Sequence, residues 1–397
     1  MPKKLVLTCL LNFLIAALMG LALRYTYLSP ISVNYRFLTH AHSHVAMLGW
    51  LYLIIYTLFV HYFIPEKNPV YNRLFWITQI SVVGMMISFS IQGYAAISIT
   101  FSTLHIFCSY YFVRLLWKNH KTESLVSKLL LKVSLLFMLI STIGVWCLGP
   151  AVGLLGPASA FYQIAIQFFL HFQFNGWFLI AVIAILFHKL HIKNSKEFRL
   201  FFKLLVASTI LTFALPVNWF VPHISLLWIN SLGVLLQLAA LYLFLKLIKD
   251  TFKSLIVNYS SISKFMLYFA LCCFILKICI QALSLIPEIS NMAYQHRNLV
   301  IGFIHLTMLG VISGFLFSFI LQSRLIQNNK TLTLSMYLFV LGFITTEFIL
   351  LLQGGLFFFG KNILPNYYLL LFLSSILLPL GIIGLIFNMM KTKQYEN

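Results

Sequence analysis

The sequence predicts an all-α integral membrane protein that is built as a bundle of twelve transmembrane helices. Of its 397 residues, 61% are hydrophobic and only 9% are charged, a balance outside the range of soluble domains. Apolar stretches long enough to cross ~30 Å of hydrocarbon recur from end to end, and glycine, proline and charged clusters separate them. The basic residues also gather at every second connection, as they do in polytopic membrane proteins.

Each apolar stretch is justified by its flanks. The first follows Lys3 and Lys4 and is predicted to be a retained span, because its apolar run outlasts a signal core and no clear small-x-small cleavage site precedes Arg24. Pro216 and Pro222 give the only clear interruption, and no connection is long enough for a separate domain, so residues 1–397 are predicted to be one polytopic membrane domain. The predicted spans are 5–26, 40–64, 73–97, 98–117, 129–149, 161–187, 200–219, 223–246, 264–286, 297–322, 331–356 and 366–390.

The net charge of +20 follows membrane topology better than it fits a nucleic-acid partner, which we exclude. Of the 27 basic residues, 22 lie on one side if the N-terminus is cytoplasmic, among them Lys67, Arg324 and Lys393. Both termini are therefore predicted to be cytoplasmic. The exceptions are Arg24, Arg36, Arg297 and Lys361 on the outer side and Lys277 within a span.

Histidines are concentrated toward the outer half of the predicted bundle. Ionisable residues inside a membrane commonly mark cofactors, ion paths or proton relays, because a polar group there is costly unless it has a partner. Eight of the twelve histidines fall in this half, on spans two, four, six, eight and ten: His40, His42, His44, His105, His171, His223, His296 and His305.

The stretch 38–52, LTHAHSHVAMLGWLY, holds three of them. A pitch of 3.6 residues places His40 and His44 on one helix face and directs His42 to the opposite side. His44 is the deepest of the three and is the best candidate to face the bundle centre. A small repeat supports this choice. His44, His171 and His305 are each followed, five positions later, by a glycine. Such a glycine allows a neighbouring helix or a flat macrocycle to approach closely.

The sequence resembles the catalytic subunit I of the haem–copper oxidase superfamily, in particular cbb-type oxidases and nitric oxide reductases, as a divergent member. Residues 36–44, Arg-Phe-Leu-Thr-His-Ala-His-Ser-His, look like the family's span-two segment. Residues 302–305, Gly-Phe-Ile-His, resemble its span-ten H-x-H pattern with the second histidine retained. Residues 171–176, His-Phe-Gln-Phe-Asn-Gly, are similar to the span-six motif of the reductases. Twelve spans and cytoplasmic termini agree with the family along most of the chain.

This resemblance implies a low-spin haem b between His44 and His305, with His40 or His42 as the other candidates in span two. Two imidazoles would fill both axial positions of the iron. Arg36 and Arg297 would bind the haem propionates bidentately, or lipid headgroups instead. A second metal, copper or another iron, would use His171 with His40, His42 or His223.

Three departures from the family pattern weaken the case for the usual oxygen-reactive centre. Phe303 stands where the family has its high-spin haem ligand, Asn175 replaces an acid, and the region 211–223 offers His223 alone where the family has a histidine pair. The expected function is therefore electron transfer or sensing in a bacterial inner membrane, with membrane lipid around the protein and a cytochrome or quinol as electron donor. The alternative within the family is an active oxidase or nitric oxide reductase with a rebuilt metal site.

A competing hypothesis is a transporter or channel that moves protons or metal ions. Glu347 and Lys277 are the only acid and the only base in the middle of a span, and such groups are expected to be paired, neutralised or wetted. Three alternatives are open: the two pair with one another, Glu347 contributes to a proton path with Thr345 and Thr346, or the groups lie at a poorly wetted interface. The six cysteines lie in apolar spans without metal or redox spacing and are predicted to serve packing.

Overall fold

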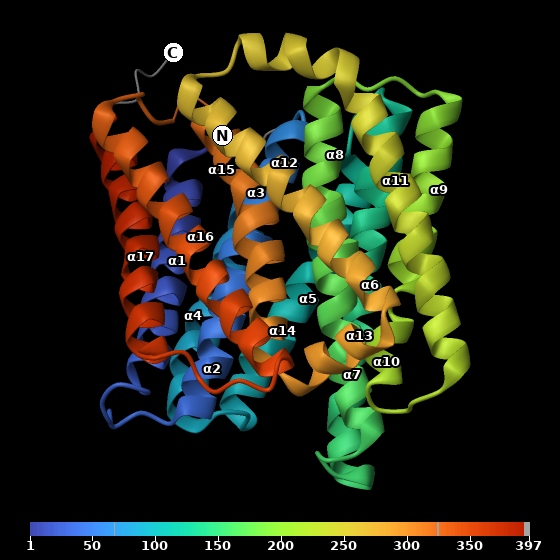
Figure 1. The fold of residues 1–397 in the computed structure, drawn as a ribbon. Helices are drawn as coiled ribbons and strands as arrows, with labels where there is room; N and C mark the ends of the chain where they lie inside the picture. Colours follow the sequence, from blue (N-terminus) through green and yellow to red (C-terminus); the bar gives the residue numbers. More distant parts are fainter. Residues whose placement is uncertain (67, 324, 393–397) are drawn as a thin grey trace. The chain divides into compact units, whose positions relative to one another are not determined.

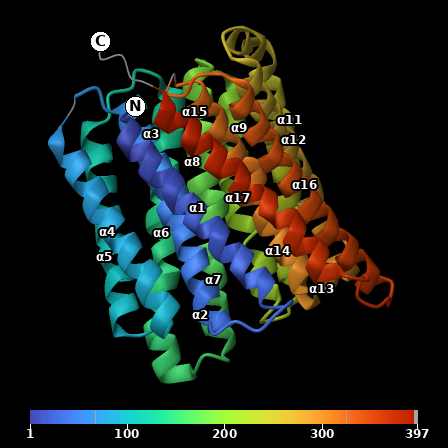
Figure 2. The ribbon, with the colours of Figure 1, turned by 90° about the vertical axis from the view of Figure 1, so that its left-hand side faces the viewer.

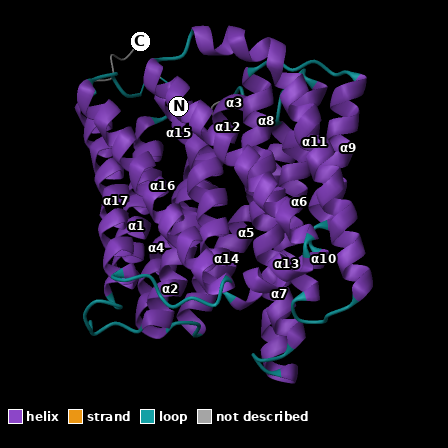
Figure 3. Ribbon diagram, in the orientation of Figure 1, coloured by secondary structure: helices purple, strands orange, loops and turns teal. Residues whose placement is uncertain are grey.

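A computed structural model describes residues 1–66, 68–323 and 325–392, without the side chain of Arg297. Every regular element in these ranges is a helix (Figure 3). Twelve helices or joined helices are long and apolar enough to cross a membrane, which confirms the predicted number of spans. They run Lys3–Tyr25, Tyr35–Phe63, Pro69–Gln92, Ala96–Asn119, Leu125–Leu155, Ala160–Lys189, Lys196–Asn218, Ile224–Val257, Ser261–Leu285, Asn298–Gln322, Lys330–Phe358 and Tyr367–Lys391.

Most predicted ends lie within a few residues of the observed ones. The boundary between spans three and four falls at Gly93, whose φ of +63° suits a residue without a Cβ. The largest difference is in span eight, where helix α11 continues to Val257. Hydropathy drops at Lys246, but the following residues contain neither proline nor glycine, so the apolar run ends before the helix does. Lys67, Arg324 and Lys393, which entered the topology prediction, lie outside the described residues.

The chain divides into two compact units, and unit 1 comprises residues 1–121, 260–268 and 313–397. Its N-terminal and C-terminal helices, α1 (Lys3–Tyr25) and α17 (Tyr367–Lys391), lie side by side (Figure 2). Lys3 Nζ donates to the Thr392 carbonyl at 2.5 Å and ties the two ends together. The other long helices of this unit are α4 (Pro69–Gln92) beside α5 (Ala96–Asn119), and α16 (Lys330–Phe358) beside α17.

Unit 2 comprises residues 122–259 and 269–312. Helix α6 (Leu125–Leu155) packs on α7, and α9 (Lys196–Leu211) packs on α11 (Ile224–Val257) (Figure 1). Around Pro216 the seventh span breaks as predicted, into α9 and the short α10. The remaining elements of this unit are α10 (Ala214–Asn218), α12 (Ser261–Ala282, from Phe269 onward), the 3-10 helix η3 (Leu283–Leu285) and α13 (Pro287–Gln295).

Three spans contain a π-helix, and each π-helix starts directly after a histidine of the His-x-x-x-x-Gly repeat. The sequence predicted an interruption at Pro216 and Pro222 alone, so these three irregular segments are additional to the prediction. π-helices are rare and often occur at functional sites. The three spans are α2 (Tyr35–His44), η1 (Val45–Tyr52) and α3 (Leu53–Phe63); α7 (Ala160–His171), η2 (Phe172–Phe178) and α8 (Leu179–Lys189); and α14 (Arg297–His305), η4 (Leu306–Ser313) and α15 (Gly314–Leu321).

These same three spans are the most buried of the twelve. In their most apolar windows 78%, 83% and 61% of the residues are buried, against at most 56% in any other span. The repeated histidines therefore stand on the helices that are best shielded within the described chain. That both termini are cytoplasmic, and that the protein lies in a bacterial inner membrane, stay predictions.

Candidate functional site

His40 and His44 share one face of α2, as the helical pitch predicts. The His44 Nδ1–H donates to the His40 carbonyl oxygen at 2.8 Å. Both rings lie against the same aromatic neighbours: the His44 and Phe89 ring centroids are 4.2 Å apart, and those of His40 and Tyr94 are 4.7 Å apart. Because Nδ1 carries the proton, Nε2 of half-buried His44 keeps its lone pair, which is the state of a metal-ligating imidazole.

His42 points away from this pair and packs against α1. Its Nδ1–H donates to the Ala16 carbonyl oxygen at 2.8 Å, and its ring lies 2.9 Å from the position that a Cβ on Gly20 would take. The opposed directions of His42 and His44 agree with the prediction from the pitch. His42 is therefore placed as a link between α1 and α2, apart from the face that His40 and His44 share.

His105 lies near this face, although no role was predicted for it. It stands on α5, 3% exposed, with its ring centroid 4.6 Å from that of Tyr52. Its Nδ1 is 3.4 Å from Ser109 Oγ, its Nε2 has no hydrogen-bond partner among the described residues, and His44 is close enough to interact with it electrostatically. Its place in the outer half was visible in the sequence, but its proximity to η1 depends on how α5 packs.

The π-helix after His44 is held by a side chain from α1. Asn12 Nδ2 donates to the Gly49 carbonyl at 2.9 Å in a buried hydrogen bond, and to Gln79 Oε1 at 2.7 Å in a partly buried one. Trp50 Nε1 adds a bond to Ser313 Oγ at 2.9 Å. The backbone carbonyls of a π-helix have other partners than in an α-helix, and Asn12 donates to one of these carbonyls from α1.

We expect Asn12→Leu to destabilise the protein by ~1–3 kcal/mol, because the buried Gly49 carbonyl would lose its donor. Thermal unfolding of detergent-purified protein measures the change. Leu18→Ala, at an exposed position on the same helix, is the control and should shift stability by at most ~0.5 kcal/mol. Equal stability of the two variants would contradict a supporting role for Asn12.

Glycines of the repeat serve helix packing. A Cβ on Gly49 would lie 2.9 Å from Val82 Cγ1 and 3.1 Å from Asn12 Cβ, and one on Gly176 would lie 2.7 Å from Phe137 Cβ. Of the two predicted uses of these glycines, the approach of a neighbouring helix is the one realised at both positions. No flat group is needed to explain them.

His171 is the last residue of α7, and it forms its hydrogen bond through Nε2, whereas His44 uses Nδ1. Nε2–H donates to the Thr209 carbonyl oxygen of α9 at 2.7 Å, and the rings of Phe172 and Phe213 surround the imidazole. Its Nδ1 therefore retains the lone pair, in contrast to His44, where Nε2 does. The asparagine beside it in the motif, Asn175, has a buried Oδ1 without a hydrogen-bond partner in the described chain.

His223 serves as a helix cap. Ser225 N–H donates to its Nδ1 at 3.2 Å, its own N–H donates to Asn218 Oδ1 at 3.0 Å, and the side chain is exposed. No described hydrogen bond or ring contact joins it to His171. Within residues 1–66, 68–323 and 325–392, no group of three or more His, Cys, Asp or Glu side chains could hold a metal ion.

The second predicted haem ligand, His305, ends α14 and is half-buried, directly before η4. It belongs to unit 2, whereas His44 belongs to unit 1, so their pairing stays a prediction. Of the two predicted propionate partners, Arg36 is exposed, and the side chain of Arg297 lies outside the described residues.

No family model and no curated protein matches this chain. The resemblance to haem–copper oxidases therefore rests on the number of spans and on the three motifs around His44, His171 and His305.

The two mid-span charges lie in different units, so their mutual pairing also stays a prediction. In unit 1, Glu347 interacts electrostatically with Arg24, whose guanidinium donates to the Leu371 carbonyl at 3.3 Å and to Ser375 Oγ. Arg24, which was predicted to lie on the outer side, stands within the last turn of α1; the sidedness itself stays a prediction. In unit 2, fully buried Lys277 donates to Gln281 Oε1 at 3.0 Å.

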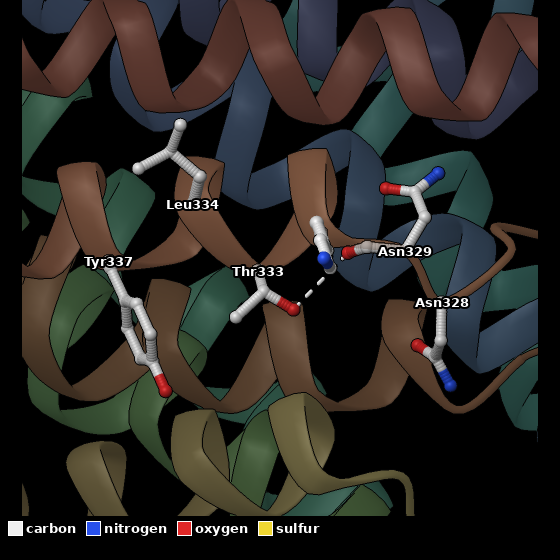
Figure 4. Close-up of a pocket in the computed structure, with 6 residues that line it drawn as sticks. Asn328, Asn329, Thr333, Leu334 and Tyr337 are labelled. Carbon is white, nitrogen blue, oxygen red and sulfur yellow. Dashed lines mark hydrogen bonds between the residues drawn. The ribbon is translucent and has the colours of Figure 1, made fainter.

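A pocket of about 490 Å³ opens at the start of α16 (Figure 4). Thr333 Oγ1 donates to the Asn329 carbonyl there at 3.2 Å. The pocket is lined by Asn328, Asn329, Lys330, Thr333, Leu334 and Tyr337. Because none of these is a histidine, a cysteine or an acid, the pocket does not contribute to the histidine sites.

Proposed function

We propose that this protein is a membrane haem b protein in which His44 is an axial iron ligand. The observation that carries the proposal is the hydrogen bond from His44 Nδ1–H to the His40 carbonyl, which leaves Nε2 as the lone-pair nitrogen. Histidines that ligate metals commonly donate their other ring N–H to a carbonyl in this way, and the bond fixes both tautomer and ring orientation. The aromatic ring of Phe89, stacked on the imidazole, restricts its rotation.

We assign His305 as the second ligand on the same local pattern. Like His44, it is half-buried, ends an α-helix and precedes a π-helix. A haem held by two histidines supplies one-electron transfer, since no axial position is left for a substrate. The chain's own residues would hold the iron at Nε2 of His44, orient that ring through His40 and Phe89, and keep water away by the burial of the span.

We do not extend the proposal to oxygen or nitric oxide reduction. A copper or non-haem iron centre of the family type needs three histidines, and the described residues do not gather three. Electron transfer in a multi-pass membrane protein instead requires a donor, for which a cytochrome or a quinol is proposed. We also propose that the protein lies in a bacterial inner membrane.

An optical spectrum of the purified protein tests the proposal. We expect a sharp Soret band with α and β bands after reduction, at about one haem per chain by pyridine haemochrome assay. Protein that is folded, monodisperse and colourless after expression with ample haem would overturn it.

His305→Ala provides a separate expectation. The haem that purified His305→Ala protein still holds has one axial ligand left and should be high-spin instead of low-spin, since the ligand field weakens. Magnetic circular dichroism and electron paramagnetic resonance report the spin state, and free imidazole should restore the low-spin signal. His296→Ala, a histidine substitution at the start of the same span, is the matched control and should leave the spectrum unchanged. A low-spin spectrum in His305→Ala would show that another residue is the second ligand.

A further inference from the structure

Unit 2 contains buried polar side chains on four successive spans, the sixth to the ninth. They are His171 on α7, Thr209 on α9, Gln237 on α11 and Lys277 on α12, and their exposed fractions are 9%, 5%, 8% and 0%. All four lie in the interior of apolar spans, where an unsatisfied polar group costs several kcal/mol. Their arrangement follows from contacts between the helices.

The contacts of α11 with the segment α12–η3 show at what height along the two helix axes Gln237 and Lys277 lie. This height is called their level. Asn230 Nδ2 donates to Ser284 Oγ at 3.3 Å, and the rings of Phe244 and Phe274 are 5.2 Å apart. The two helices are therefore antiparallel. Gln237 is seven residues beyond Asn230, and Lys277 is seven residues before Ser284, which is two turns in each helix. Gln237 and Lys277 thus reach the same level on facing sides.

The contacts of α9 with α11 bring Thr209 to that level as well. A Cβ on Gly233 would lie 2.9 Å from the Thr212 backbone nitrogen, so the two backbones are in close contact there. One turn farther along each antiparallel helix are Gln237 and Thr209. The Thr209 carbonyl accepts the Nε2–H of His171, and Lys277 interacts with His171 electrostatically. The four side chains therefore form one layer, which we call the polar layer.

Among the described residues, the layer does not find all the hydrogen-bond partners that it needs. An ammonium has three donors, but Lys277 Nζ has a single hydrogen-bond acceptor in the described chain, Gln281 Oε1, together with the face of Phe303, whose centroid is 5.7 Å away. Gln237 Oε1 and Asn230 Oδ1 are buried and have no hydrogen-bond partner among the described residues. Unused donors and unused acceptors lie along the same pair of helix faces.

We propose that internal water fills a half-channel in unit 2, from Asn230 and Ser284 past Gln281 to the polar layer. Water both donates to orphaned amide oxygens and accepts from an ammonium, and a buried site holds it when two to four polar partners surround it. The half-channel solvates Lys277 at a depth where no carboxylate of unit 2 contacts it within the described residues. It also gives protons a route to the level of His171. The proposal is independent of haem binding.

Thiol labelling of the membrane-embedded protein tests the half-channel. Ser284→Cys, Gln281→Cys and Gln237→Cys are each treated with the small anionic reagent 2-sulfonatoethyl methanethiosulfonate, and the labelled site is located by mass spectrometry. We expect all three to react at least about tenfold faster than native buried Cys273, because only a hydrated thiol ionises to the reactive thiolate. Ile278→Cys, on the same helix at a position that is 2% exposed, is the matched control and should stay unreactive.

A second measurement uses the unmodified chain, so that misfolding of a variant cannot decide the result. Hydroxyl radicals generated by radiolysis label side chains beside bound water, and we expect oxidation of Phe303 but not of fully buried Phe178. The proposal is overturned if Gln281→Cys and Gln237→Cys match Ile278→Cys while Phe303 stays unoxidised. Labelling of Ser284→Cys alone also overturns it, because the path would then end at the surface.

Discussion

We expect His44→Ala to abolish the haem spectrum while His42→Ala keeps it. The two histidines are two residues apart on one helix, but only His44 has its Nδ1–H directed to the His40 carbonyl and its ring stacked on Phe89. His42 is bonded to the Ala16 carbonyl of α1 instead. Removing the proposed ligand should lower the haem content of the purified protein at least about tenfold, since second ligands and packing seldom replace a lost axial bond.

The pyridine haemochrome assay gives the haem content of both variants, and size-exclusion chromatography shows whether they fold. His42→Ala loses a partly buried hydrogen bond to the Ala16 carbonyl, and His44→Ala loses one to the His40 carbonyl, so the two variants are matched in this respect. Haem retained in folded His44→Ala would contradict the assignment. Haem lost from both variants, with both folded, would mean that α2 as a whole, rather than one imidazole, determines binding.

The second large effect is expected at Gly144, where α6 meets α7. A Cβ there would collide with the Ala165 carbonyl oxygen and lie 2.9 Å from the Phe169 backbone nitrogen. Because backbone atoms cannot rotate away, Gly144→Ala should separate the two helices and cost ~1–3 kcal/mol or more. His171 ends α7, so its bond to Thr209 should weaken with the displacement.

Gly153→Ala is the control on the same helix, since nothing lies within 4 Å of the Cβ that it would add. An alanine there should be neutral or stabilise the helix by up to ~1 kcal/mol. Thermal unfolding of both variants in one detergent measures the difference. Equal unfolding temperatures would show that α6 and α7 do not pack as closely as the structure has them.

The twelve spans could be predicted because their signal is local. An apolar run of sufficient length has to be a helix in a bilayer, where every backbone group needs an internal partner. The same criterion failed at the end of α11, since hydropathy reports where a helix leaves hydrocarbon and not where its hydrogen bonds stop. Lys246 marks the first position, and Val257 marks the second.

The π-helices could not be predicted, because nothing in their own residues distinguishes them. Residues 45–52 are as apolar as an ordinary span, and the bonds that hold η1 come from Asn12 on α1 and from Ser313, 263 residues away from Trp50. The sequence did contain the position of the irregularity, in the spacing of histidine and glycine. It gave no indication that this spacing involved backbone geometry.

The candidate site was predicted in the same uneven way. Helical pitch alone separated His42 from His40 and His44. His105 was missed because its closeness to Tyr52 depends on the packing of α5, and the level shared by Gln237 and Lys277 depends on the register of two antiparallel helices. The capping role of His223 could have been suspected from the serine two residues later, whose backbone N–H a cap accepts.

The π-helix after His44 makes chain length itself a determinant of where that imidazole points. Wider winding accommodates one residue more than regular winding would over the same rise. If residues 45–52 rewound to a regular α-helix with none of them removed, the surplus residue would rotate the outer part of the span by about 100° against the inner part. His44 would then turn off Phe89 although no side chain at the site had been exchanged.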